Sequence, residues 1–179
     1  MDSTEIYNVE EYIPTKEDLF FFDNNIWIFL FCPLGEHQYY RQKIYSSFLK
    51  KILDVGALVF INDLVLSEFS NTYFRLDFNY WKKEQKGNYT YKKDYVGTPR
   101  YQKIASDIHY AIDDILDVAT HSNLSINELG LDDVLSNIEY IDFNDSFYLE
   151  QAKKGHWKIV TDDKDFQKVS SQVSIITRM

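Results

Sequence analysis

Short apolar runs alternate with segments of helical periodicity along this chain, and that alternation restricts its fold more than any other feature. Helical stripes of apolar residues are expected over 36–53, 64–83, 104–119 and 144–154. Buried strands are expected over 19–22, 58–61, 138–141, 157–160 and 173–176. Strands that alternate with helices form a parallel sheet covered on both faces. We therefore expect an α/β fold, a three-layer α/β/α sandwich around a mostly parallel sheet of about four or five strands.

Acidic residues stand near the ends of several of these strands. Asp23, Asp145 and Asp163 follow three expected strands, and Glu68 lies at least one turn into the helix after a fourth. Ligands of a parallel sheet bind beyond the carboxyl ends of its strands, so we expect the four carboxylates at one edge. Crowded carboxylates raise one another's pKa, and a hard cation such as Mg²⁺ or Mn²⁺ relieves that cost.

Each of these acids, taken alone, is as well explained by ordinary local structure. An Asp after a strand often forms a turn or caps a helix. A Glu on a helix is most often solvent-exposed, and an Asp in the first turn of a helix suits the helix dipole. The prediction of a metal site therefore depends on four acids that come from four separate segments.

The local sequences around the four acids resemble the motifs of the PIN-domain nucleases, which include the VapC-type toxins of bacterial toxin–antitoxin pairs. The matching segments are FFDNNIW at Asp23, LSEF at Glu68, NDSFYLEQA from Asn144 and TDDKDF from Thr161. The last of these is the most specific, and the set extends over 19–166. The order of the motifs and their positions after strands make the resemblance convincing as a set.

The resemblance implies metal-dependent hydrolysis of a phosphodiester, usually in RNA, with Mg²⁺ or Mn²⁺ as the cofactor. In this family the metal lies among the residues that match Asp23, Glu68, Asp145 and Asp163, which are the expected catalytic residues. Asp165 matches a further acidic position for a second ion or an oriented water. Asn25 and Thr161 match polar positions that support the site.

Three points stay open in this assignment. Asp142 and Asp145 both precede the same expected helix, so either can fill the third acidic position. Asp162 and Asp163 are adjacent, and only the Thr-x-Asp spacing favours Asp163. Whether one or two metal ions bind is also open.

A basic and aromatic insert occupies about 82–103, where we expect a loop or a hairpin because of its two glycines and its proline. It contains seven basic and two acidic residues, a balance of +5, while the rest of the chain carries −14. Basic and aromatic residues that alternate are typical of single-stranded nucleic-acid grooves. The expected contacts are Lys82, Lys83, Lys92, Lys93 and Arg100. The competing interpretation is a solvated loop whose tyrosines pack back on the body.

The remaining composition excludes several kinds of site. Cys32 is the only cysteine, so the chain has no internal disulfide and no zinc site built from several cysteines. Its four histidines have no metal-ligand spacing. No apolar run is long enough to span a bilayer. We expect one domain over 1–179, in a cytoplasmic protein that does not bind membranes.

We expect an endoribonuclease that acts on RNA, and the resemblance implies the toxin of a toxin–antitoxin pair. Such toxins resemble one another in forming homodimers and in being blocked by a small antitoxin protein. The alternative is a non-catalytic PIN-like domain that binds RNA or a protein partner without cutting it.

Overall fold

A parallel sheet lies at the centre of the molecule. The computed structural model describes residues 5–34, 39–169 and 171–179, and six strands occur within them. Their order across the sheet is β1-β6-β5-β2-β3-β4, and every neighbouring pair is parallel. The bounds are β1 (Ile6–Asn8), β2 (Leu19–Phe22), β3 (Leu58–Ile61), β4 (Thr120–His121), β5 (Lys158–Val160) and β6 (Ile175–Thr177).

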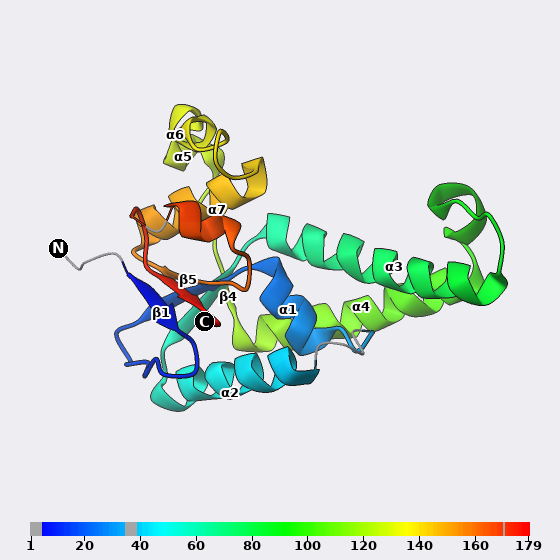
Figure 1. The fold of residues 1–179 in the computed structure, drawn as a ribbon, viewed down its shortest axis with the longest axis horizontal. Coiled ribbons are helices and arrows are strands. Elements are labelled where there is room, and N and C mark those ends of the chain that lie inside the picture. Colours follow the sequence, from blue (N-terminus) through cyan, green and yellow to red (C-terminus); the bar gives the residue numbers. More distant parts are fainter. Residues whose placement is uncertain (1–4, 35–38, 170) are drawn as a thin grey trace.

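Helices cover both faces of this sheet, which confirms the α/β/α class. Figure 1 shows α7 on one side of the sheet and α2 on the other, while α3 and α4 extend away together. The central strand β2 has the sequence LFFF, and its three phenylalanines are fully buried, as expected for a strand with helices on both sides. The helices are α1 (Asn24–Phe31), α2 (Tyr39–Val55), α3 (Asp63–Gln85), α4 (Pro99–Val118), α5 (Ile126–Leu129), α6 (Leu131–Ser136) and α7 (Phe143–Gly155).

Polar residues fix where four of the helices begin. The side chains of Asp23, Asn62, Thr98 and Asp142 each accept a hydrogen bond from a backbone N–H in the first turn of the following helix. Asp23 directly follows β2 and Asn62 directly follows β3. The chain therefore turns from strand to helix at the carboxyl edge of the sheet within a single residue.

The expected strand over 138–141 is wrong, because those residues form turns. Only Ile141 of its two isoleucines is buried, and Ile138 is exposed. The strands β1 and β4 were not expected, because each is very short and exists through its pairing with β6 or β3. The expected helix over 36–53 corresponds to α2, and residues 36–38 of that expectation lie outside the described part of the chain.

The expected loop over 82–103 is mostly helical. Helix α3 continues to Gln85, a π-helical turn spans Tyr91–Tyr95, and α4 begins at Pro99. We call the distal halves of α3 and α4, with the turn that joins them, the arm (residues 74–104). Its aromatic rings pack on one another at centroid distances of 5.0–6.1 Å, among Phe78, Trp81, Tyr89, Tyr91 and Tyr95.

Candidate active site

Asp23 lies at the junction of β2 and α1 and is almost fully buried. Its Oδ1 accepts a hydrogen bond from the N–H of Asn24 at 2.6 Å, and its Oδ2 accepts one from Thr161 Oγ1 at 2.7 Å and another from Asn25 Nδ2. Thr161 is adjacent because β5, which it follows, pairs with β2. Burial, reinforced by the charges of Glu68 and Asp163, raises the pKa of Asp23 to about 7. Asn25 and Thr161 therefore hold the Asp23 carboxylate in place by hydrogen bonds.

Glu68 lies in the second turn of α3 and faces α7. Asn144 Nδ2 donates to its Oε1 at 2.6 Å, and the Tyr148 hydroxyl donates to its Oε2 at 2.6 Å. Burial and this hydrogen bond to Glu68 strongly raise the pKa of Tyr148, which keeps the hydroxyl a donor. Neither Asn144 nor Tyr148 was expected as a site residue. Their i, i+4 spacing on α7 is the signal that marks one helix face.

The structure separates Asp145 from Asp142. Asp142 Oδ1 accepts a hydrogen bond from the N–H of Asp145 at 2.9 Å, so Asp142 is the N-cap of α7. Asp145 is partly buried, and burial together with the charges of Asp23, Asp142, Asp163 and Glu68 raises its pKa to about 8. Asp145 therefore belongs to the acidic group, and the charge of Asp142 at the N-cap position contributes to its raised pKa.

The structure also separates Asp163 from Asp162. The Asp162 carboxylate accepts from the Tyr45 hydroxyl at 3.0 Å and pairs with Arg41 at 3.1 Å and Arg178 at 3.3 Å. Those partners balance its charge in a separate cluster. Asp163 instead acts electrostatically on both carboxyls with raised pKa values, those of Asp23 and Asp145. We call Asp23, Glu68, Asp145 and Asp163 the acidic quartet.

Asp165 is placed differently from the quartet. Its backbone N–H donates to Asp163 Oδ1 at 2.8 Å, and its carboxylate forms an ion pair with Lys168 Nζ at 2.7 Å. Lys168 therefore balances the Asp165 charge locally. The predicted role of Asp165 in holding a second ion stays a prediction.

The quartet has the donor chemistry of a hard-cation site, but its side chains are held apart in this structure. Among the described residues, no three His, Cys, Asp or Glu side chains are arranged so that they could share one metal ion. Asp23 and Glu68 instead direct their oxygens at Thr161, Asn144 and Tyr148. The donors are carboxylates alone, which suit Mg²⁺ or Mn²⁺. Their mutual effect on pKa is the cost that a bound cation would relieve.

The predicted nucleic-acid contacts divide into two kinds. Within the part of the chain that the structure describes, Lys82, Lys83, Lys92 and Lys93 form no ion pair with an acidic residue. Arg100 instead binds Asp77 through two hydrogen bonds of 2.8 Å and also pairs with Glu84. Arg100 therefore joins the two helices of the arm, and we no longer expect it to contact nucleic acid.

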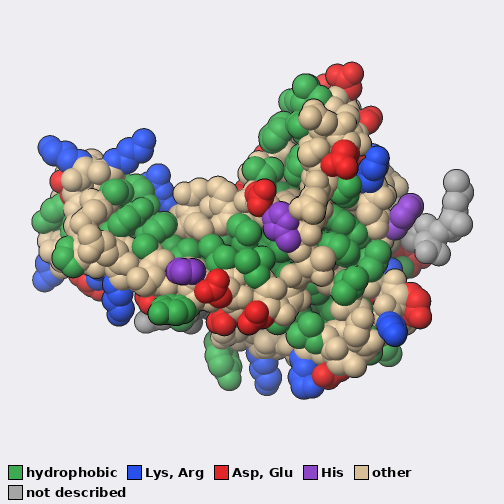
Figure 2. Space-filling view, turned by 180° about the vertical axis from the view of Figure 1, so that it is seen from behind, with side chains coloured by type: hydrophobic (Ala, Val, Ile, Leu, Met, Phe, Trp, Pro, Cys, Tyr) green, Lys and Arg blue, Asp and Glu red, His purple; other side chains and the backbone are tan. Residues whose placement is uncertain are grey.

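The aromatic residues of the arm do not present free stacking surfaces. Phe78 and Tyr95 are buried, and the Trp81 ring lies 5.0 Å from that of Tyr89 and 5.6 Å from that of Tyr95. The tyrosines thus pack on Phe78, Trp81 and one another within the arm, whereas the competing interpretation expected them to pack on the body. Figure 2 shows Lys and Arg side chains gathered around the far end of the arm. The arm therefore presents basic side chains at its surface, and its aromatic rings pack its helices and turn together.

Comparison with known proteins identifies the fold and the family. A chain of the crystal structure of VapBC2 from Rickettsia felis, bound to a DNA fragment from their promoter, is similar, with a TM-score of 0.52 and 15% sequence identity. The match covers 88% of this chain and 96% of that chain. No curated protein sequence matches. No helix among the described residues is both long and apolar enough to cross a membrane. The family model of the PIN domain matches residues 20–172, a span that includes all four acids of the quartet, so the chain belongs to the PIN domain family.

Proposed function

We propose that this protein is a metal-dependent endoribonuclease that hydrolyses phosphodiester bonds in RNA with Mg²⁺ or Mn²⁺. The observation that carries the proposal is the electrostatic coupling of the acidic quartet at the carboxyl edge of β2 and β5. Burial raises the pKa values of Asp23 and Asp145 to about 7 and about 8, and the charges of the other acids add to both rises. Proteins gather carboxylates at this cost where they bind a cation or hold a proton.

The residues of the site divide into ligands and supports. Asp23, Glu68, Asp145 and Asp163 would hold the cation, which would lower the pKa of a bound water and stabilise charge on the leaving oxygen. Thr161 and Asn25 fix the Asp23 carboxylate by hydrogen bonds. Asn144 and Tyr148 fix that of Glu68.

Protonation of Asp145 competes with binding of the cation. With a pKa of about 8, its carboxyl holds a proton through much of the neutral range. A ligand carboxylate must release that proton before it binds metal. We therefore expect metal affinity to rise with pH up to about 8.

The proposal is tested by RNA cleavage with and without Mn²⁺. We expect cleavage by the wild type, and a loss of at least about a hundredfold in Asp23→Asn and Asp163→Asn, because each lacks a charged ligand. Asp142→Asn is the matched control, since it removes a neighbouring charge while asparagine still caps α7. Equal activity in Asp163→Asn and in the wild type would overturn the assignment.

We further propose that the protein is the toxin of a toxin–antitoxin pair. The support is its fold, which is similar to that of a chain in a VapBC2 complex. Induced expression in the bacterial cytoplasm should stop growth, and Asp163→Asn should restore it. A small antitoxin should co-purify with the inactive variant, and light scattering should show a homodimer. RNA binding without cleavage under all metal conditions would instead support the non-catalytic alternative.

A further inference from the structure

One face of α3 carries a row of polar side chains that leads from the acidic quartet to the arm. Glu68, Thr72, Arg75, Asn79 and Lys82 stand at positions i, i+4, i+7, i+11 and i+14 of this unbroken helix. At 3.6 residues per turn, this spacing places them on one face. Arg75 and Asn79 are exposed, and the other three are partly exposed. The row is therefore accessible along its length.

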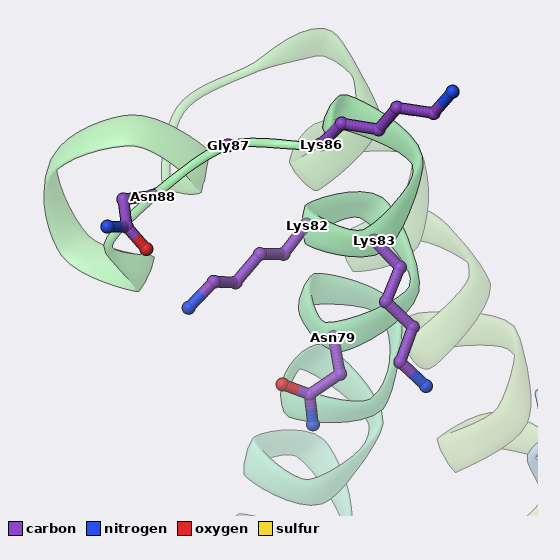
Figure 3. A pocket seen from close by; sticks show the side chains of 6 residues that line it. All are labelled: Asn79, Lys82, Lys83, Lys86, Gly87 and Asn88. Atoms are coloured by element: carbon purple, nitrogen blue, oxygen red, sulfur yellow. The ribbon is translucent and has the colours of Figure 1, made fainter.

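The distal end of the row opens into a pocket of about 760 Å³. Its lining residues are Asn79, Lys82, Lys83, Lys86, Gly87 and Asn88. Figure 3 shows Lys82 pointing into the hollow between the amides of Asn79 and Asn88, while Lys86 points away. Ammonium and amide groups together form a set of hydrogen-bond donors that suits phosphate oxygens.

The cations of this surface are not neutralised by the protein. Arg75, Lys82 and Lys83 form no ion pair with an acidic residue in the described part of the chain. The Arg75 guanidinium instead lies 4.1 Å from the centre of the Tyr91 ring, which holds it beside the row. The whole chain carries −9, so unpaired cations on this one face favour a polyanion there over the rest of the surface.

The length of the row sets how far along a strand these contacts fall. Lys82 follows Glu68 by 14 residues on α3, which is about 21 Å at 1.5 Å per residue. A stacked strand has one phosphate per about 3.4 Å, so this distance corresponds to about six nucleotides.

We propose that this face of α3 binds the phosphate backbone of the substrate RNA about six nucleotides from the bond that is cut. The proposal rests on the proposed function and adds a strand-length requirement to it. The rings of Trp81, Tyr89 and Tyr91 are packed within the arm, so the contact is made by charge and is independent of base sequence. Longer strands therefore bind more tightly, and salt weakens that gain.

The test uses the inactive Asp163→Asn protein, so that RNA is bound and not cut. Arg75→Gln, Lys82→Gln and Lys83→Gln are introduced together into this protein, and the result is the arm variant. The control carries Lys16→Gln, Lys43→Gln and Lys50→Gln, which remove the same charge from exposed lysines elsewhere. Binding of RNAs of about 20 and about 4 nucleotides is measured as KCl is raised at constant Mg²⁺. Circular dichroism melting confirms that each variant is folded.

For the long RNA, three lost phosphate contacts should reduce the salt slope by about 2. Between about 50 and about 200 mM KCl, the affinity of the arm variant should therefore fall about 20-fold less than that of the control. The short RNA should bind both variants equally. A charge-conserving variant with Arg75→Lys, Lys82→Arg and Lys83→Arg should retain the full slope.

Equal slopes in the arm variant and the control would overturn the proposal, as would an equal loss on the short RNA. Polyglutamate provides a further check, since a loss of polyglutamate binding as large as that of RNA would refute RNA as the occupant. The two proposals fail separately. An active wild type whose arm variant binds like the control refutes only the α3 contact, whereas length-dependent binding without cleavage refutes only the nuclease.

Discussion

Replacing Asp145 by asparagine should stabilise the protein in the absence of metal, by an amount that grows as the pH rises from about 4 to about 8. The pKa of this carboxyl rises from 3.8 to about 8 on folding, first through burial and then through neighbouring acids. The folded protein therefore binds this proton more tightly than the unfolded chain does. That contribution is fully present below about pH 4 and is lost as the pH rises to about 8. Asparagine cannot ionise and avoids the loss.

The magnitude follows from the difference between the folded and unfolded pKa values. A rise from 3.8 to about 8 corresponds to about 6 kcal/mol, at about 1.36 kcal/mol for each pKa unit. Asp145 is partly exposed and shares its repulsion with Asp23 and the other acids, and water screens part of it. We therefore expect about 2 kcal/mol. For a chain of this length, each kcal/mol changes the melting temperature by about 2–4 °C, so the variant should melt about 4–8 °C higher.

Thermal unfolding followed by circular dichroism in EDTA, at about pH 5 and about pH 8.5, measures this difference. The advantage of Asp145→Asn over the wild type should appear at the higher pH and shrink at the lower one. Asp142→Asn keeps the cap of α7 and should show a much smaller stability advantage over the wild type. Mg²⁺ should stabilise the wild type more than Asp145→Asn. A variant that melts no higher than the wild type at the higher pH would refute the reasoning.

Three further substitutions test the ion pair of the arm, the packing at the end of α7 and a hydrogen bond to Glu68. Arg100→Ala leaves Asp77 buried without its charge partner and should cost about 3–5 kcal/mol in urea unfolding; an unchanged midpoint would contradict that. Gly155→Ala places a methyl group against the Trp157 ring, too close for both to fit, and should cost about 1–3 kcal/mol in the same assay. Tyr148→Phe removes a donor to the Glu68 carboxylate and should slow single-turnover RNA cleavage about tenfold; full activity would rule out positioning by the hydroxyl.

The sequence predicted the parts of the fold whose pattern is set locally. The strand bounds of β2 and β3 are confirmed, because a continuous apolar run followed by a capping residue leaves few alternatives. The run over 138–141 has similar residues but forms turns, since short apolar runs do not define a strand without a partner in the sheet. The strand β4 has only polar residues and exists because it pairs with β3.

The site likewise contains residues that the local sequence predicts and contacts that only distant segments provide. Asp23, Asp145 and Asp163 were expected after strands and Glu68 on a helix, but the strand expected before Asp145 does not form. The choice between Asp162 and Asp163 depended on spacing alone. The structure supplies the physical reason, because Arg41 and Arg178 come from distant segments and bind Asp162. Asn144 and Tyr148 share one face of α7 by their i, i+4 spacing, but that spacing does not show that Glu68, 76 residues before Asn144, is their partner.

The packed rings of the arm form a cluster that can unfold separately from the body of the molecule. Phe78 and Tyr95 are buried but lie outside the continuous core that encloses Trp27 and Trp157. A satellite cluster of this kind can lose its structure at a lower free energy than the body. Backbone amides in the distal half of α3 should then exchange their hydrogens faster than those in its first turns. Trp81, the one tryptophan of the arm, gives that event an intrinsic fluorescence signal distinct from global unfolding.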